Sequence, residues 1–109
     1  SQQSSGETSE IVAARVLAGR EHQLQRQGKP NARLSSAELE QHCPLQSADS
    51  AFLEQAVSQL QLSSRSFHKL WKVARTIADL AGDASIARPH LLEALSYRAF
   101  DRLLQYLHG

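Results

Sequence analysis

Five positively charged or chargeable side chains recur every three or four residues in one segment of the chain. They are Arg65, His68, Lys69, Lys72 and Arg75. At this spacing they follow one side of an α-helix for about three turns. Such a line of cations could contact the phosphates of a nucleotide or of a nucleic-acid backbone. A solvated helix face is the simpler interpretation of the spacing alone, so a phosphate site needs further support.

The helix that carries these residues is predicted over Leu62 to Gly82. Ser63 or Ser64 can cap its first turn, and Gly82 can end it in the left-handed conformation. Apolar residues at steps of three and four predict one buried face: Phe67, Leu70, Trp71, Ala74, Ile77, Ala78 and Ala81. The helix therefore has one face for a core and a cationic face outside it.

A second long helix is expected near the N-terminus. It should begin at Thr8 or Ser9, either of which can act as its cap, and run to about Gln27, where the following glycine and proline stop it. Its second half, residues 19–28, holds one large apolar residue and many polar ones. We therefore expect that half to project beyond the core, to lie against a partner, or to fray.

The middle of the chain predicts two more helices. A loop at residues 29–34 leads to a short helix that begins at about Ser36 and ends before Pro44, because proline disfavours helix at the residue before it. A longer helix is predicted over residues 48–60, with Ser47 as its cap.

The expected elements add up to an all-α fold. Pro89 suits the first turn of a last helix of about five turns, and no segment alternates as a strand would. We predict a small helical bundle of four main helices plus a short one. Residues 1–8 lack large apolar groups and are expected to form a flexible linker, which leaves residues 9–109 as the domain.

Composition narrows the class of protein. The 109 residues suffice for one domain, and 41% hydrophobic with 21% charged residues is typical of a soluble protein. No apolar run approaches the roughly 20 residues of a membrane helix, and no signal-peptide pattern is present, so we expect a cytoplasmic protein without membrane contact. The single cysteine, Cys43, excludes a disulfide framework, and we assign it no chemistry.

The charges are unevenly distributed along the chain, although the formal net charge is only +1. Residues 1–62 contain five Lys or Arg against seven Asp or Glu, whereas residues 63–109 contain seven against four. The positive half is the one that contains the basic helix, which favours an anionic partner there.

Sequence motifs of several enzyme classes are missing. The phosphate loop GxxxxGK[ST], the HExxH zinc pattern and the GxSxG nucleophile turn do not occur, and the five histidines are scattered. We therefore expect no complete active site and no metal site. Two interpretations stay open: a helical module of a larger enzyme that touches bound phosphate, or a stand-alone helical DNA-binding or protein-interaction module.

Longer strings permit a more specific assignment. VARTIADLAG and EALSYRAFDRLL, with RVLAGREHQLQRQGKPNARL and LEQHCPL before them, resemble the C-terminal region of bacterial magnesium-chelatase-like AAA+ ATPases of the competence type. The resemblance covers nearly the whole chain from about Gly6. It implies that residues 9–109 form an AAA+ lid-like domain, a piece of a larger ATPase.

The resemblance also implies a role and partners. The parent protein is expected to be a hexameric ring that binds ATP and Mg²⁺ and remodels DNA as a helicase, promoting branch migration in natural transformation. The expected partners of the lid are the upstream AAA+ core and neighbouring subunits. Alone, the chain is expected to be monomeric, to be inactive and to bind neither ATP nor Mg²⁺ tightly. Magnesium insertion into a porphyrin is not expected.

One residue stands out in this comparison. AAA+ lids carry a sensor-2 arginine at the start of a lid helix, and Ser63, Ser64 and Arg65 occupy that place here. A guanidinium stays charged and offers a fork of donors to the ATP γ-phosphate. Arg65 is thus the implied catalytic and nucleotide-binding residue. Lys69 and Arg75 are kept as further candidate contacts.

Overall fold

The computed structural model describes residues 8–108, with side chains placed for all of them except residues 99, 100 and 102–108. The helices are α1 (Ser9–Gln27), α2 (Ser36–His42), α3 (Ser47–Gln59), α4 (Ser64–Ala81) and α5 (Arg88–His108), with a 3₁₀ turn, η2 (Asn31–Arg33), between α1 and α2. No strand occurs within residues 8–108. The prediction of an all-α fold with four main helices and a short one is confirmed.

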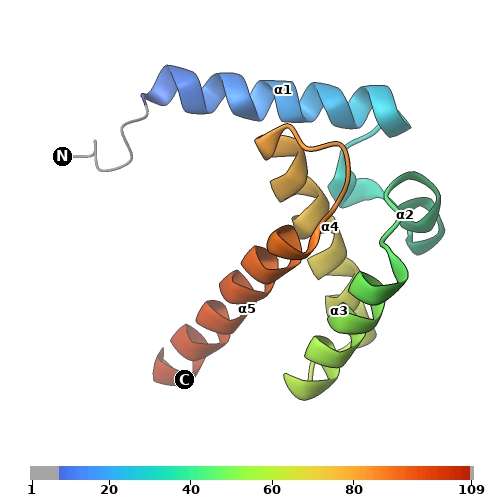
Figure 1. Cartoon of the computed structure of the whole chain (residues 1–109). Helices are drawn as coiled ribbons and strands as arrows, with labels where there is room; N and C mark the ends of the chain where they lie inside the picture. The colour runs from blue at the N-terminus through green and yellow to red at the C-terminus, as the bar shows by residue number, and fades with distance from the viewer. Residues whose placement is uncertain (1–7, 109) are drawn as a thin grey trace.

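Helix α4 is the centre of the arrangement. It contacts α1, α2, α3, α5 and the turn η2. Figure 1 shows α1 lying across the C-terminal end of α4. Helices α3 and α5 extend away from α1 and diverge from each other. Contacts with α4 therefore help to position each of the other described helices and the turn η2. No helix between residues 8 and 108 combines the length and apolar character that a bilayer-spanning helix requires.

The ends of α4 follow from its sequence. The Ser63 hydroxyl accepts a hydrogen bond from the backbone N–H of Ser66, and Gly82 ends the helix with φ of 78°. A residue with a side chain would be strained in that left-handed conformation. Both predicted boundaries of this helix are therefore confirmed.

The apolar face of α4 forms the core with residues from every other helix except α1. Leu70, Trp71, Ala74 and Ala78 are buried, whereas Ala81, at the end of the predicted face, is exposed. The buried residues that complete the core are Leu34, Leu39, Cys43, Leu53, Val57, Ile86, Leu91 and Ala94.

Trp71 anchors the chain between α2 and α3 to α4. Its indole Nε1 donates a hydrogen bond to the Cys43 carbonyl at 2.8 Å, and its ring meets the Phe67 ring edge-on. Cys43 itself is almost completely buried, and burial raises the pKa of its thiol. A thiol of that kind is less available as a nucleophilic thiolate.

The boundaries in the middle of the chain agree with the sequence except at two places. Ser35 caps α2 in a reciprocal capping box with Glu38, as its position predicts. The predicted cap of α3 is wrong by one residue, because Ser47 is the first helical residue and Gln46 occupies the cap position without a side-chain hydrogen bond. The expected loop at residues 29–34 contains the turn η2.

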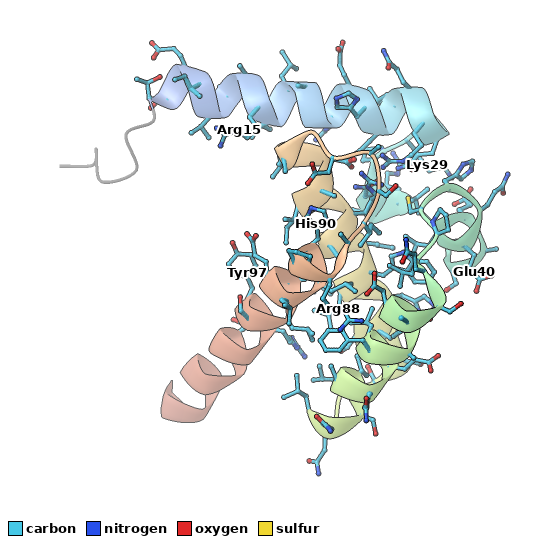
Figure 2. The ribbon with its side chains drawn as sticks, in the orientation of Figure 1. Arg15, Lys29, Glu40, Arg88, His90 and Tyr97 are labelled. Carbon is cyan, nitrogen blue, oxygen red and sulfur yellow. The ribbon has the colours of Figure 1, made fainter. Side chains whose placement is uncertain are left out.

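Helix α5 begins with an unusual cap. The side chain of Ala87 cannot accept a hydrogen bond, so His90 takes part instead: its Nδ1 accepts from the Ala87 N–H at 2.9 Å. His90 Nε2 then donates to the Asp83 carboxylate at 2.8 Å. Arg88, the first residue of α5, joins this helix to α3 through Asp49 (Figure 2).

The expectation for the second half of α1 is wrong. That half packs on α4, with Gly19 and Gln23 buried, while the more apolar first half is exposed. The reason is that polar residues of this half form hydrogen bonds with other parts of the domain. Their polarity therefore does not mean that they face solvent. A Cβ on Gly19 would lie 3.3 Å from Leu80, which places glycine where the two helices approach closely.

Replacing Trp71 with Phe should destabilise the domain. The change removes the buried indole donor, leaves the Cys43 carbonyl unpaired and opens a small cavity, so we expect a loss of about 2–4 kcal/mol in the free energy of unfolding. Urea denaturation measures it. Tyr97→Phe is the matched control, since its hydroxyl donates to Glu93 on the exposed surface. Equal losses in the two variants would contradict the anchoring role of Trp71.

Candidate functional site

The cationic side of α4 borders a groove. The groove has a volume of about 660 Å³ and lies between the first four turns of α4, the turn η2 and the start of α2. Its lining residues are Ala32, Ser36, Arg65, His68, Lys69, Lys72, Val73, Thr76 and Ile77. The structure thus brings together four of the five basic residues singled out in the sequence, and none of the described acidic residues lines the groove with them.

Arg65 and Lys69 are the cations of this groove that have no hydrogen-bonding or ion-pair partner among the described residues. Both side chains are exposed, and within the described part of the chain neither forms a hydrogen bond or ion pair. Arg65 is the second residue of α4, one turn before Lys69. Its guanidinium is therefore available to an anion from outside the domain.

Lys72 and His68 are held by the domain itself. The Lys72 ammonium donates to the Ala32 carbonyl at 3.1 Å. His68 donates from Nδ1 to the Ser64 carbonyl at 3.1 Å, and its ring stacks on Trp71 with an interplanar angle of 15°. These contacts keep both side chains against the protein, so they shape the groove and are less free to follow a ligand.

Arg75 does not share this surface. Only 3% of it is exposed, and its guanidinium binds the Asp79 carboxylate at 2.9 Å and the carbonyls of Asp83 and Ala84. The expectation of one continuous line from Arg65 to Arg75 fails, because steps of three and four residues drift around a helix of 3.6 residues per turn. After ten residues the side chain has turned toward α1.

Asp79 is the centre of a buried network that sequence patterns did not reveal. Arg26 from α1 holds its carboxylate with two hydrogen bonds of 2.9 and 3.2 Å, and the Asn31 amide donates to it at 2.9 Å. With Arg75, two guanidinium groups therefore face one carboxylate. The one sequence signal was an aspartate among the apolar residues of a helix, four positions after an arginine.

The network shifts the pKa values of its two best-connected groups. Burial alone would raise the pKa of Asp79, but hydrogen bonds from Arg26 and Asn31 and the charge of Arg75 hold it below its ordinary value. Burial alone would lower the pKa of Arg26, and Asp79 raises it instead. Both groups stay charged, which is the condition for a stable buried ion pair.

The network also builds one wall of the groove. Asn31 donates to the Thr76 hydroxyl at 3.0 Å, and the Gln23 side chain accepts from the Asn31 N–H at 2.9 Å. These bonds fix η2 against α4, so that the Ala32 carbonyl meets Lys72. The position of the groove wall therefore depends on Asp79 through Asn31.

The charges of the residues that line the groove suit an anion. Among the described residues, no cluster of three His, Cys, Asp or Glu side chains could hold a metal ion. What the groove offers is an unpaired guanidinium, a second cation one turn away and an apolar floor that includes Val73 and Ile77. This arrangement suits a phosphate group or a similar anion.

Comparison with known proteins identifies the family. The family described as "Magnesium chelatase, subunit ChlI C-terminal" matches residues 6–98. The chain belongs to this family. Two relatives of this chain are Competence protein ComM of Haemophilus influenzae, 54% identical over 102 residues, and Uncharacterized protein YifB of Escherichia coli, 52% identical over 102 residues. The resemblance stated from the sequence is thereby confirmed.

The matches cover most of this chain but only a small part of each relative. In both cases the match includes 94% of this chain and 20% of the relative. The chain thus spans about a fifth of the length of the curated relatives it matches. No solved structure gives a significant match.

Acid should weaken the domain through Asp79. Because its folded pKa lies below the unfolded value of about 4, its contribution to stability is present above that value and is lost as the pH falls through the folded pKa. We expect the free energy of unfolding of the wild type to fall from about pH 5 downward, and that of Asp79→Asn to fall less steeply. Urea denaturation at several pH values measures both slopes. Parallel slopes would show that Asp79 is not the group responsible.

Proposed function

We propose that this chain is the lid domain of a longer AAA+ ATPase and that Arg65 contacts the γ-phosphate of ATP held mainly by the rest of that protein. The observation that supports the proposal best is the state of Arg65: an exposed guanidinium in the first turn of α4, beside a groove without acidic residues and without a partner among the described residues. A cation left unpaired in this way is suited to a ligand from outside the domain.

The structure also supports choosing Arg65 over the other candidates. Arg75 is buried against Asp79, and Lys72 is bonded to Ala32, so neither can reach a ligand without breaking internal contacts. Lys69 is available and lies one turn further along the groove, where it can hold a second phosphate oxygen. Only arginine offers a forked set of donors that remains charged at any physiological pH.

In this proposal the domain supplies charge to the reaction and does not supply the nucleophile. ATP hydrolysis develops negative charge on the transferred phosphoryl group, and a positioned guanidinium stabilises that charge. Arg65 and Lys69 are the residues of this chain that fit the nucleotide. Mg²⁺ and the other phosphates would be bound by residues outside it, as the missing phosphate loop suggests.

The role of the whole protein is proposed from its relatives. One of them is Competence protein ComM of Haemophilus influenzae, and the chain covers a fifth of its length. We infer a cytoplasmic ring ATPase, a hexamer, that uses ATP hydrolysis to remodel DNA as a helicase during natural transformation. The partners of this domain are then the upstream core and neighbouring subunits, and the isolated chain is a monomer that binds ATP weakly.

The ATPase activity of the full-length protein tests the role of Arg65. Arg65→Ala should lower kcat by about 100-fold or more, because one charge-stabilising donor is lost from the transition state. Arg65→Lys should restore little of it, since a lysine lacks the fork. Arg33→Ala removes another exposed arginine outside the groove lining and should leave kcat unchanged. Undiminished turnover in Arg65→Ala would overturn the assignment.

Direct DNA binding by the groove is the second candidate. The observation in its favour is the set of four basic residues without a carboxylate among them. Titration of the isolated chain with labelled single-stranded DNA at low salt separates the two candidates. We expect no micromolar binding. Micromolar affinity that falls with added salt and in the Lys69→Ala variant would instead favour a phosphate-backbone contact.

A further inference from the structure

A second hollow lies where α2, α3 and α4 meet, and we call it the aromatic hollow. Its volume is about 300 Å³, which is at the low end for ligand pockets and suits one long side chain better than a whole helix. Residues four positions apart share one side of a helix, so Ser50 and Glu54 of α3 face the hollow together, as do Phe67 and Trp71 of α4. The lining residues are Glu40, Pro44, Leu45, Ser50, Glu54, Phe67 and Trp71.

The floor of the aromatic hollow is apolar and aromatic. Trp71 is buried, Phe67 is half-buried, and their rings meet edge to face with the centroids 5.9 Å apart. Leu45, also half-buried, adds an aliphatic surface beside them. Aromatic rings attract positive charge through their electron-rich faces, and apolar surface covers the alkyl stem of a long basic side chain. The floor therefore suits a long side chain that ends in a cation.

The rim of the aromatic hollow has the opposite charge to such a side chain. Glu40 of α2 (Figure 2) and Glu54 of α3 are exposed, and among the described residues neither has a hydrogen-bonding or ion-pair partner. None of the described Lys, Arg or His residues lines the hollow with them. By contrast, Glu38 of the same α2 is paired with Lys29 at 2.8 Å. The hollow is thus complementary to a cation that comes from outside the domain.

The domain holds one of its own arginines by the same combination of groups. The Arg88 guanidinium lies over the Phe52 ring, 4.1 Å from the ring centroid, and its Nε donates to the Asp49 carboxylate at 2.8 Å. A guanidinium stacks on aromatic faces and offers a planar fork of donors to carboxylates. The aromatic hollow provides both kinds of group, and no arginine of the described chain lines it.

We propose that the aromatic hollow binds an arginine side chain of a protein partner. The alkyl stem packs on Leu45 and on the rings of Phe67 and Trp71, and the guanidinium donates to the carboxylates of Glu40 and Glu54. Arginine is one of the residues that most often anchor a protein interface by filling a small pocket. The hollow is therefore a recognition site for a basic protein segment.

This site is independent of the groove beside Arg65. Phe67 follows Arg65 by two residues, which is a rotation of about 200° around the helix axis, so the two side chains lie on opposite sides of α4. The two surfaces also have opposite charge. Failure of the arginine site would leave the proposed role of Arg65 untouched, and the reverse also holds.

Nuclear magnetic resonance of the 109-residue chain tests the site with two short peptides that have blocked ends, Gly-Arg-Gly and Gly-citrulline-Gly. Trp71 is the one tryptophan of the chain, so its indole N–H signal reports on the floor of the hollow. We expect the arginine peptide to shift this signal saturably at millimolar concentration, as is usual for a ligand of this size. Citrulline has nearly the same shape without the charge and should bind at least about fivefold more weakly.

A matched pair of double variants tests the two carboxylates. Glu40→Gln/Glu54→Gln should weaken binding of the arginine peptide by at least about fivefold. Glu10→Gln/Glu21→Gln changes the net charge equally at two exposed positions of α1 and should bind as the wild type does. All four substitutions are at exposed positions, so both variants should fold, and circular dichroism checks this.

Three results would overturn the proposal. One is the absence of a saturable shift of the Trp71 indole signal with the arginine peptide. Another is equal affinity for the arginine and citrulline peptides, since the guanidinium charge would then play no part. The third is an equal loss of affinity in the two double variants, because the net charge of the chain and not the aromatic hollow would then attract the peptide.

Discussion

The buried carboxylate of Asp79 is the group on which the arrangement of this domain depends. It accepts hydrogen bonds from Arg26 of α1 and Asn31 of η2 and pairs with Arg75 of its own helix. A charge taken out of water is costly unless its partners surround it. The three segments must therefore be in their native positions together, which makes the α1–α4 crossing specific where apolar contact alone would leave it adjustable.

The same network divides the basic residues of α4 between structure and function. Asp79 draws Arg75 into the interior, and Asn31 fixes the turn whose Ala32 carbonyl engages Lys72. Arg65 and Lys69 have no such partner in the described part of the chain. The row of cations, which looks uniform in the sequence, therefore contains two sets. Arg75 and Lys72 form contacts within the domain, whereas Arg65 and Lys69 remain available to an anion.

Local rules predicted most of the fold. Ser63, Ser35 and Gly82 determine helix ends through bonds to their near neighbours, so their positions could be read from the sequence. The α1 orientation could not, because a polar residue such as Gln23 is buried when a distant backbone group, here the Asn31 N–H, pairs with it. Hydrophobic periodicity contains no information on such long-range pairing.

The candidate site shows the same limit. The position of Arg65 in the first turn of α4 followed from its capping residue, whereas the burial of Arg75 depends on Arg26 and Asp79, which are 53 residues apart in sequence. Likewise, the exposure of Leu17 could not be predicted, since it depends on where α1 crosses α4. Residues whose roles are set by neighbours within one turn were predictable, and those set by tertiary contacts were not.

A matched pair of variants in the full-length protein tests most directly whether Arg75 is structural and Arg65 functional. The free energy of unfolding and the ATP turnover are measured for each variant. We expect Arg75→Met to lose about 2–4 kcal/mol of stability, because it leaves Asp79 and two carbonyls short of a partner. Arg65→Met should change stability by no more than about 0.5 kcal/mol and should lose most ATP turnover at temperatures where it is folded. A stable, inactive Arg75→Met protein beside a fully active Arg65→Met protein would contradict the assignment of the two arginines.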